Sequence, residues 1–347
     1  MNGKTMRAAI FKGGGRVDME VVPRPVVEKA DDVILKVEAC SICGTDVHIL
    51  NVPPAFEADR GIALGHELAA RVVKTGAGVK NLKPGDRVVV KPNIYCGTCW
   101  YCLNDMNNHC ENMVSIGVHI GGGFAEYCKA PEKVCYKIDP KLPAPTAVFA
   151  EPLACVLGGL KKLDLMPSSS AVIIGGGPIA LIYLLMLKRA GIGPVIVSEL
   201  SKNRLTVAKE LGADIVVNPA EQDLASAVKK YLPRGADMAV DVVGSQLGAA
   251  LACVRRRGTV LLFGLNLNAE AAVRQSDITL REIDVKGTYV DDATFHTAVD
   301  ILEKGLIDLK PLITHTLPLG RFLEGVDLLR TGKGMEIIIV PDGEPDA

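Results

Sequence analysis

The sequence lacks an excess of charge of either sign. Its 347 residues include 39 lysines and arginines against 40 aspartates and glutamates, which leaves a formal net charge of −1. Proteins that bind nucleic acid or an anionic membrane surface need clustered positive charge, because that charge displaces counterions from phosphate. We therefore expect neither nucleic acid nor a membrane as a partner.

The sequence also lacks an uninterrupted apolar run of membrane-spanning length. The longest uncharged stretch, 165–187, is divided into two short pieces by Pro167 and by Gly175–Pro178. Near the N-terminus, the apolar stretch Ala8–Phe11 is too short for a signal peptide. We expect a cytoplasmic protein, in which the ten cysteines indicate metal binding or catalysis before disulfides.

The length favours about two domains. Residues 1–150 contain short β-branched runs separated by Gly, Pro and Asp-Arg pairs, which predicts a mostly β domain. The expected strands are Val33–Val37, Ala69–Val73, Arg87–Lys91 and Val134–Ile138.

Residues 151–288 alternate short apolar runs with helical or turn-rich stretches, which predicts a doubly wound parallel sheet with helices on both faces. The expected strands are Ala171–Ile174, Val195–Val197, Ile215–Val217, Met238–Val243, Thr259–Phe263 and an edge strand at Ile283–Lys286; the first helices are Ile179–Ala190 and Lys202–Leu211. In residues 289–347 we expect helices at Ala293–Lys304 and Leu319–Arg330 and a final strand at Glu336–Val340.

Four cysteines are spaced C-x2-C-x2-C-x7-C, at Cys96, Cys99, Cys102 and Cys110. Four thiolates can surround one tetrahedral zinc ion and leave no position open for substrate, so the spacing predicts a structural zinc lobe at about residues 93–112. Incidental thiols or an iron–sulfur cluster are the alternatives.

A second set of possible ligands consists of Cys43, His66, Glu67 and Glu151. Thiolate, imidazole and carboxylate together suit zinc, and three protein ligands with one open position are typical of a catalytic zinc site. Taken singly, His66 also fits a structural histidine, and Glu151-Pro152 also fits an element boundary.

A glycine-rich turn follows the expected strand Ala171–Ile174. Gly175 and Gly177 allow the backbone to approach a pyrophosphate, and the next helix presents unpaired N–H groups. Glu199 ends the following strand, where a carboxylate accepts hydrogen bonds from the ribose and repels a 2′-phosphate. This favours NAD over NADP, although Arg204, one helical turn later, leaves NADP open. The expected cofactor-binding residues are Gly175, Gly177, Pro178, Ile179, Glu199 and Arg204. A glycine turn of some other α/β enzyme is the alternative.

Taken in order, these motifs resemble the zinc-dependent medium-chain alcohol dehydrogenases, over nearly the whole chain. The matching segments are Cys43–Asp46, Gly65–Glu67, the four-cysteine lobe, Gly122–Tyr127, Glu151–Ala154, the glycine turn and Leu211–Asp214. Glu151–Ala154 is similar to the polyol (sorbitol) and threonine dehydrogenase branch. One departure lies in the lobe, where Asp105 stands at a position that is usually glycine.

The resemblance implies a GroES-like β domain, closed by the C-terminal segment 289–347, with a Rossmann NAD-binding domain inserted at 151–288. It implies two zinc ions per subunit, the catalytic one held by Cys43, His66 and Glu67, with Glu151 as an exchangeable ligand. It also implies that Thr45 and His48 relay the substrate proton to solvent, and that the protein is a homo-oligomer, a tetramer or a dimer.

We therefore predict an NAD-dependent oxidoreductase that converts a secondary alcohol, preferably a polyol or sugar alcohol, to a ketone. L-Threonine, a diol or a simple secondary alcohol is the alternative substrate, because Asn51–Pro54 and Val290-Asp291 replace residues typical of the two named branches. Arg60 and Lys91 are cations without an assigned role, which leaves a phosphorylated polyol open. A non-catalytic nucleotide- or zinc-binding protein would leave Cys43, His66, Glu67 and Glu151 without a role.

Overall fold

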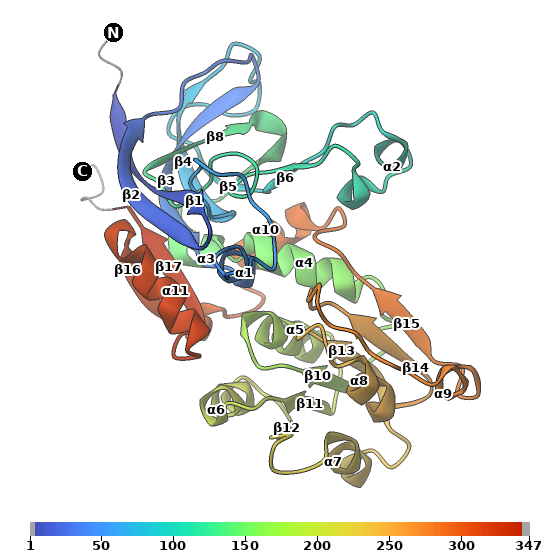
Figure 1. Ribbon diagram of the computed structural model, residues 1–347. Helices are drawn as coiled ribbons and strands as arrows, with labels where there is room; N and C mark the ends of the chain where they lie inside the picture. Colours follow the sequence, from blue (N-terminus) through green and yellow to red (C-terminus); the bar gives the residue numbers. More distant parts are fainter. Residues whose placement is uncertain (1–3, 342–347) are drawn as a thin grey trace. The chain divides into compact units, whose positions relative to one another are not determined.

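The computed structural model describes residues 4–341. The described residues up to Ala154 and from Asp292 onward form one compact unit, the β unit, and Cys155–Asp291 form a second, the α/β unit. The α/β unit is thus an insertion in the sequence of the β unit, and Figure 1 shows the chain leaving the β unit and returning to it.

A six-stranded sheet in which every neighbouring pair is parallel forms the centre of the α/β unit. The strand order is β12-β11-β10-β13-β14-β15, so the order reverses at β10 and the glycine turn after β10 lies at the switch point, where such sheets bind ligands. The strands are β10 (Ala171–Ile174), β11 (Val195–Ser198), β12 (Ile215–Val217), β13 (Ala236–Asp241), β14 (Val254–Leu262) and β15 (Asp284–Gly287). The helices are α5 (Pro178–Arg189), α6 (Lys202–Glu210), α7 (Leu224–Tyr231), α8 (Leu247–Cys253) and α9 (Gln275–Thr279).

This topology confirms the predicted doubly wound sheet, including β15 as an edge strand. Only β14 differs clearly, because it begins at Val254 rather than at Thr259. The early part pairs with β13 across a register shift between Ala236 and Met238, and it includes Arg257 with a φ of 55°. Its charged run Arg255–Arg257 has no apolar alternation, so the pattern did not indicate a strand there.

The β unit is built on a seven-stranded sheet in the order β16-β17-β3-β4-β5-β9, with β8 also paired to β3. Its strands are β3 (Asp32–Ser41), β4 (Glu67–Thr75), β5 (Arg87–Val90), β8 (Tyr127–Pro131), β9 (Cys135–Lys137), β16 (Ile313–Pro318) and β17 (Glu336–Val340), and a separate hairpin pairs β1 (Thr5–Gly13) with β2 (Arg16–Pro23). The C-terminal strand β17 lies against β3, so residues far apart in sequence share one sheet. The expected strands and the helices α10 (Phe295–Glu303) and α11 (Phe322–Arg330) are confirmed, whereas β16 was not predicted because its exposed faces carry Thr314 and Thr316.

The two faces of this sheet differ in what they bury. Alternate residues such as Cys40, Leu68 and Ile337 belong to the main apolar core of the β unit. The intervening residues point to the opposite face, where the short helix α3 (Ala144–Ala147) contacts β3 and β4. At the end of β3, that opposite face carries the buried polar side chain of Ser41, which lies opposite Glu67 on β4.

Helix α4 (Ala150–Leu160) was not predicted, because Pro152 and the glycine pair Gly158-Gly159 are residue types that are typical of turns and disfavoured within helices. Gly159 is required there: a Cβ atom would lie 1.9 Å from the Tyr183 hydroxyl oxygen. The helix therefore packs closely on α5 at this point.

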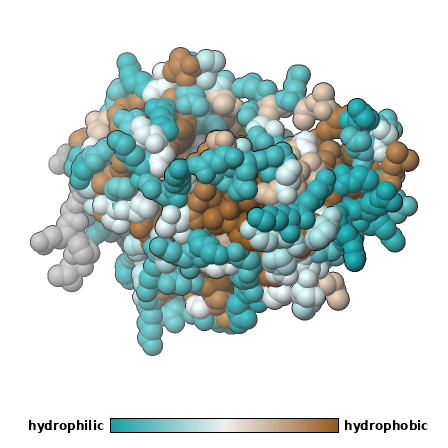
Figure 2. Space-filling model, turned by 90° about the horizontal axis from the view of Figure 1, so that it is seen from below, coloured by the Kyte–Doolittle hydropathy of each residue, from teal (hydrophilic) through white to brown (hydrophobic). Residues whose placement is uncertain are grey.

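No helix within residues 4–341 is long and apolar enough to cross a membrane. On the face shown in Figure 2, hydrophilic residues predominate and apolar residues reach the surface in patches.

Candidate functional site

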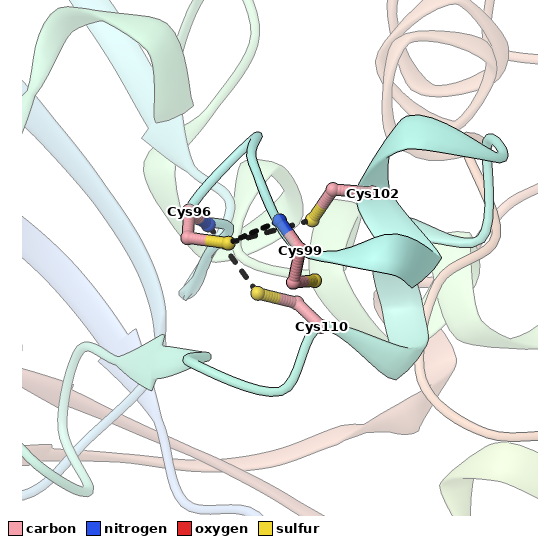
Figure 3. Close-up of side chains that lie close together, drawn as sticks. All are labelled: Cys96, Cys99, Cys102 and Cys110. Atoms are coloured by element: carbon pink, nitrogen blue, oxygen red, sulfur yellow. Dashed lines mark hydrogen bonds between the residues drawn. The ribbon is translucent and has the colours of Figure 1, made fainter.

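The four predicted zinc cysteines converge on one point in a lobe between β6 (Asn93–Ile94) and β7 (Val114–Ser115) (Figure 3). Their sulfur atoms all lie within 4.8 Å of one another, and Cys96 and Cys102 are 4.0 Å apart. Zinc–sulfur bonds of about 2.3 Å in a tetrahedron place sulfurs about 3.8 Å apart, so the donor set fits zinc.

Backbone geometry prepares these thiols to act as ligands. Backbone N–H groups of Thr98 and Cys99 donate to the Cys96 sulfur at 3.4 and 3.3 Å. These hydrogen bonds lower the pKa of Cys96 to about 5, whereas burial raises that of Cys102 to about 12. One turn of the lobe passes through Asp105 at a φ of 59°, in the left-handed region, which explains why glycine is usual here and why a short polar side chain is tolerated.

The second cluster brings together Cys43, His66 and Glu67, whose ligand atoms also lie within 4.8 Å of one another. The register of the sheet produces this meeting, because Ser41 at the end of β3 lies opposite Glu67 at the start of β4. The chain then turns from β3 into α1 (Gly44–Ile49), with Cys43 as its N-cap.

The residue before His66 must be glycine. Gly65 has a φ of 92°, and a Cβ atom on it would lie 2.8 Å from the Cys40 sulfur and 2.9 Å from the Phe124 ring. A side chain at position 65 would therefore displace the histidine from the cluster.

The electrostatics of this cluster fit a divalent cation. Burial raises the pKa of Cys43 well above its usual range, and the charges of Glu67, Asp46 and Glu151 raise it further. Burial also raises the pKa of Glu67 to about 8. A cation among these donors would favour their ionised forms, and sulfur, imidazole and carboxylate together are zinc ligands.

The Asp46 carboxylate lies beside the imidazole ring of His66. Asp46 is fully buried, its Oδ2 accepts from the Cys43 backbone N–H at 2.9 Å, and its Oδ1 lies 3.8 Å from Nδ1 of His66. Neither that Oδ1 nor that Nδ1 has a hydrogen-bond partner. Histidines that bind metal through one nitrogen are commonly oriented by a carboxylate at the other.

The remaining predicted residues lie around this cluster. Glu151 is in the first turn of α4; it is not among the three clustered ligands, but its charge acts on Cys43, His66 and Glu67. Thr45 and His48 are both in α1, and His48 is exposed.

In the α/β unit, the glycine turn has the geometry of a phosphate-binding turn. Gly175 has a φ of 118°, and a Cβ atom on it would lie 2.6 Å from Val242. Gly177 is the N-cap of α5, Pro178 and Ile179 begin that helix, and a Cβ atom on Gly177 would meet only Arg204, at 4.0 Å. Gly177 thus has free space at its Cβ position, which fits the close approach of a phosphate to the N-terminus of this helix.

Glu199 lies directly after β11 and reaches back to this turn. Its Oε2 accepts from the Gly176 N–H at 2.7 Å, and its Oε1 accepts from the Ser201 N–H at 2.8 Å. The structure thus brings Glu199, Arg204 and the glycine turn together, as the motif predicts.

Three residues of the metal-site region had no predicted role: Asp46, Ser41 and Glu336. Ser41 hydrogen-bonds to Glu67 Oε2, and Glu336, the first residue of β17, is buried nearby. A weak signal existed, since Glu336 is the one charged residue at the start of the apolar run EIIIV. Nothing in the sequence, however, placed β17 beside β3.

The fold, the cysteine lobe and the mixed-ligand cluster together define a zinc-binding dehydrogenase. Two family models match the chain: the alcohol dehydrogenase GroES-like domain at residues 29–140 and the zinc-binding dehydrogenase domain at residues 178–304. The chain is 30% identical to sorbitol dehydrogenase of Gallus gallus, over 98% of this chain and 97% of that protein. It is 33% identical to L-threonine 3-dehydrogenase of Caldanaerobacter subterraneus, over 90% and 92%.

Among solved structures, a putative zinc-binding dehydrogenase of Sinorhizobium meliloti bound to NADP superimposes with a TM-score of 0.92 at 30% identity, covering 97% of this chain and all of that one. The chain therefore belongs to the zinc-dependent medium-chain alcohol dehydrogenase family, in the branch that includes sorbitol and threonine dehydrogenases, and it is an oxidoreductase. The resemblance predicted from the motifs is confirmed.

Proposed function

We propose that this enzyme oxidises a secondary hydroxyl of a polyol or sugar alcohol to a ketone, with NAD as the hydride acceptor. The observation that carries the proposal is the cluster of Cys43, His66 and Glu67, three zinc donors on a chain whose relatives include sorbitol dehydrogenases. Zinc held there supplies a Lewis acid that lowers the pKa of an alcohol hydroxyl.

The chain's own residues then have separate tasks. Cys43, His66 and Glu67 hold the metal, Asp46 orients His66, and Glu151 serves as an exchangeable ligand from α4. Thr45 and His48 pass the substrate proton toward solvent; His48 suits the last step because its side chain is exposed and can exchange a proton with water.

An NAD-reduction screen tests the substrate class. Sugar alcohols, their phosphates, cyclitols, diols and L-threonine are compared by kcat/KM, and we expect the largest value for an unphosphorylated polyol. Lys91 is not available to a phosphate, because it is buried with its ammonium over the Tyr95 ring, 4.4 Å from the centroid. Arg60 is exposed, so the phosphates are kept in the comparison. A preference for L-threonine, the substrate named for a relative at 33% identity, would replace the proposal with the second candidate.

We assign the selection of NAD over NADP to Glu199. The carboxylate beside the glycine turn favours the two ribose hydroxyls of NAD and repels a 2′-phosphate, while Arg204 lies next to the same turn. We expect Glu199→Ala to lower kcat/KM for NAD and to raise it for NADP, changing their ratio by about 100-fold, equivalent to about 2.7 kcal/mol.

Steady-state kinetics with both cofactors measures this change. Glu210→Ala removes a carboxylate from the far end of α6 and is the matched control, for which the ratio stays constant. An unchanged ratio in Glu199→Ala would remove Glu199 from cofactor selection.

We also propose that the enzyme is a homo-oligomer and that edge strand β15 forms part of its interface. Apolar side chains on and around this edge are exposed, among them Leu280 (79%) and Leu267 (66%), together with Leu265, Val273 and Val285. A parallel-sheet edge with uncovered apolar side chains is complementary to a second copy of itself. The metal-binding thiols suit the reducing cytoplasm, where we place the enzyme.

Placing a charge on this edge should weaken self-association. We expect the double variant Leu280→Glu, Val285→Glu to shift the mass measured by light scattering toward the monomer, because like charges would face each other across a two-fold interface. Leu323→Glu changes an exposed side chain of α11 in the β unit; it is the control and should leave the mass unchanged. An unaltered mass in the double variant would place the interface elsewhere.

A further inference from the structure

Three side chains on one face of the β-unit sheet form a buried polar row that ends at the metal cluster. Ser41 lies opposite Glu67 on β4 and opposite Ile338 on β17, so the three strands β4, β3 and β17 are adjacent at this level. Paired residues point to the same face, and so do residues two apart on a strand. Glu336, two residues before Ile338, therefore shares the face of Ser41 and Glu67.

The row is closed to solvent. Glu67 and Glu336 are 3% and 4% exposed, and Ser41 is 0% exposed. Ser41 hydrogen-bonds to Glu67 Oε2, and Glu336 is the diagonal neighbour of Ser41 on the adjacent strand β17. The buried carboxyl oxygen Oε1 of Glu336 has no hydrogen-bond partner.

Burying the Glu336 carboxyl in this way lowers the stability of the folded protein, which indicates that the residue has a functional role. A buried carboxyl group that lacks a partner destabilises the fold, and the same position would accept an apolar side chain, as its neighbours Ile337, Ile338 and Ile339 do. Burial and the charge of Glu67 raise the pKa of Glu336 well above its usual range.

Hydrogen-bond capacity explains how the row is held. A serine hydroxyl has one hydrogen and two acceptor sites, so it can donate to only one of two carboxyl groups. When Ser41 donates to Glu67, its oxygen can still accept a hydrogen from the group at position 336. Glutamine can supply this hydrogen through its N–H, whereas leucine cannot.

We propose that Glu336 is a positioning residue, which acts through Ser41 to hold the Glu67 carboxylate in its orientation in the cluster with Cys43 and His66. The inference rests on the proposed function, because it takes Glu67 as a ligand of the catalytic metal. Glu336 itself touches neither substrate nor cofactor in this role. Residues that orient a metal ligand through hydrogen bonds in this way affect how tightly the site binds its metal.

Cobalt substitution at the cluster tests the proposal on the full-length enzyme. The visible spectrum of bound Co²⁺ reports the geometry of its ligands, and the rate of Co²⁺ loss to a chelator reports how firmly they hold it. We expect Glu336→Leu and Ser41→Ala each to alter the spectrum and to accelerate metal loss by about 10- to 100-fold. Glu336→Gln should restore both to near the wild-type values.

Thermal unfolding separates positioning from a purely structural role. Because leucine replaces an unpartnered polar group with an apolar one, Glu336→Leu should keep or raise the Tm of the metal-free protein while the metal is lost faster. Ile338→Val, on the same face of β17, is the packing control and should leave the spectrum and the rate of metal loss unchanged.

Combination with Glu67→Gln completes the test. In that background, Glu336→Leu should add no further acceleration of metal loss, since its effect passes through Glu67. Additive effects, or a wild-type spectrum in both Glu336→Leu and Ser41→Ala, would overturn the inference while the proposed function stands. A Co²⁺ spectrum that does not change in Cys43→Ala would instead show that the proposed catalytic site is wrong.

Discussion

Replacing Cys43 with alanine should lower kcat/KM by at least about 10³-fold, the loss expected when a metal that contributes several kcal/mol to the transition state is no longer held. The thiol is one of three clustered donors, and it lies at the N-cap of α1, where no neighbouring thiol replaces it in the cluster. Two donors, His66 and Glu67, would remain, which is fewer than the three protein ligands of a catalytic zinc site.

The change should be confined to the metal cluster. Binding of NAD, measured by calorimetry or fluorescence, should be retained, because Gly175, Gly177 and Glu199 belong to the α/β unit and Cys43 belongs to the β unit. Zinc content should fall from two ions per chain to one. Cys155→Ala is the control, since this thiol lies in α4 but outside the cluster, and it should keep both zinc ions and most of the activity. Full turnover by Cys43→Ala with one zinc ion would contradict the assignment.

Replacing Cys99 with serine should have the largest effect on stability. In the lobe, the buried cluster consists of Cys99, Cys102 and Cys110, against which Tyr95, Cys96, Tyr101 and Met113 pack. The sulfur atoms are therefore the core of this segment, and without a metal there is little apolar area to keep it folded. We expect the loss of one zinc ion and a fall in Tm of about 10 °C, corresponding to about 3 kcal/mol in a unit of this size.

Limited proteolysis should locate that effect. Cleavage within about residues 93–112 should become fast in Cys99→Ser, while the first turnovers measured immediately after purification remain close to normal, because the catalytic cluster is made of other residues. Cys135→Ser changes a half-buried cysteine of β9 outside both clusters and should leave the zinc content and Tm close to those of the wild type. An unchanged Tm and two retained zinc ions in Cys99→Ser would exclude a structural zinc at these cysteines.

The parts of the site that were predictable are those in which the ligands are close in sequence. Cys96 to Cys110 are contained in one short loop, so their spacing alone limits how far apart the sulfurs can be. Similarly, Ala171–Ile174, the glycine turn and α5 are consecutive, and the strand, turn and helix could be placed from the apolar pattern and the glycines. In both cases the geometry of one short segment is sufficient to predict which residues come together.

Helix α4 and strand β16 show the opposite case. Gly159 in α4 is explained only by the hydroxyl of Tyr183 packed against it, a contact made by another helix. Strand β16 has polar residues on its exposed positions and is identified as a strand through its pairing with β17. Tertiary contacts outweighed the local pattern at both places.

The amino-acid sequence by itself determined the doubly wound sheet, the family, the cysteine lobe and the identity of the clustered donors, because each depends on residue types at short range or on motifs in a fixed order. Only the tertiary structure decided that Glu336 lies beside Ser41 and Glu67, and that the Asp46 carboxylate faces His66. Strand pairing joins segments nearly 300 residues apart through backbone hydrogen bonds, which are common to all residue types. A linear pattern therefore does not reveal which buried acid will face the metal ligands.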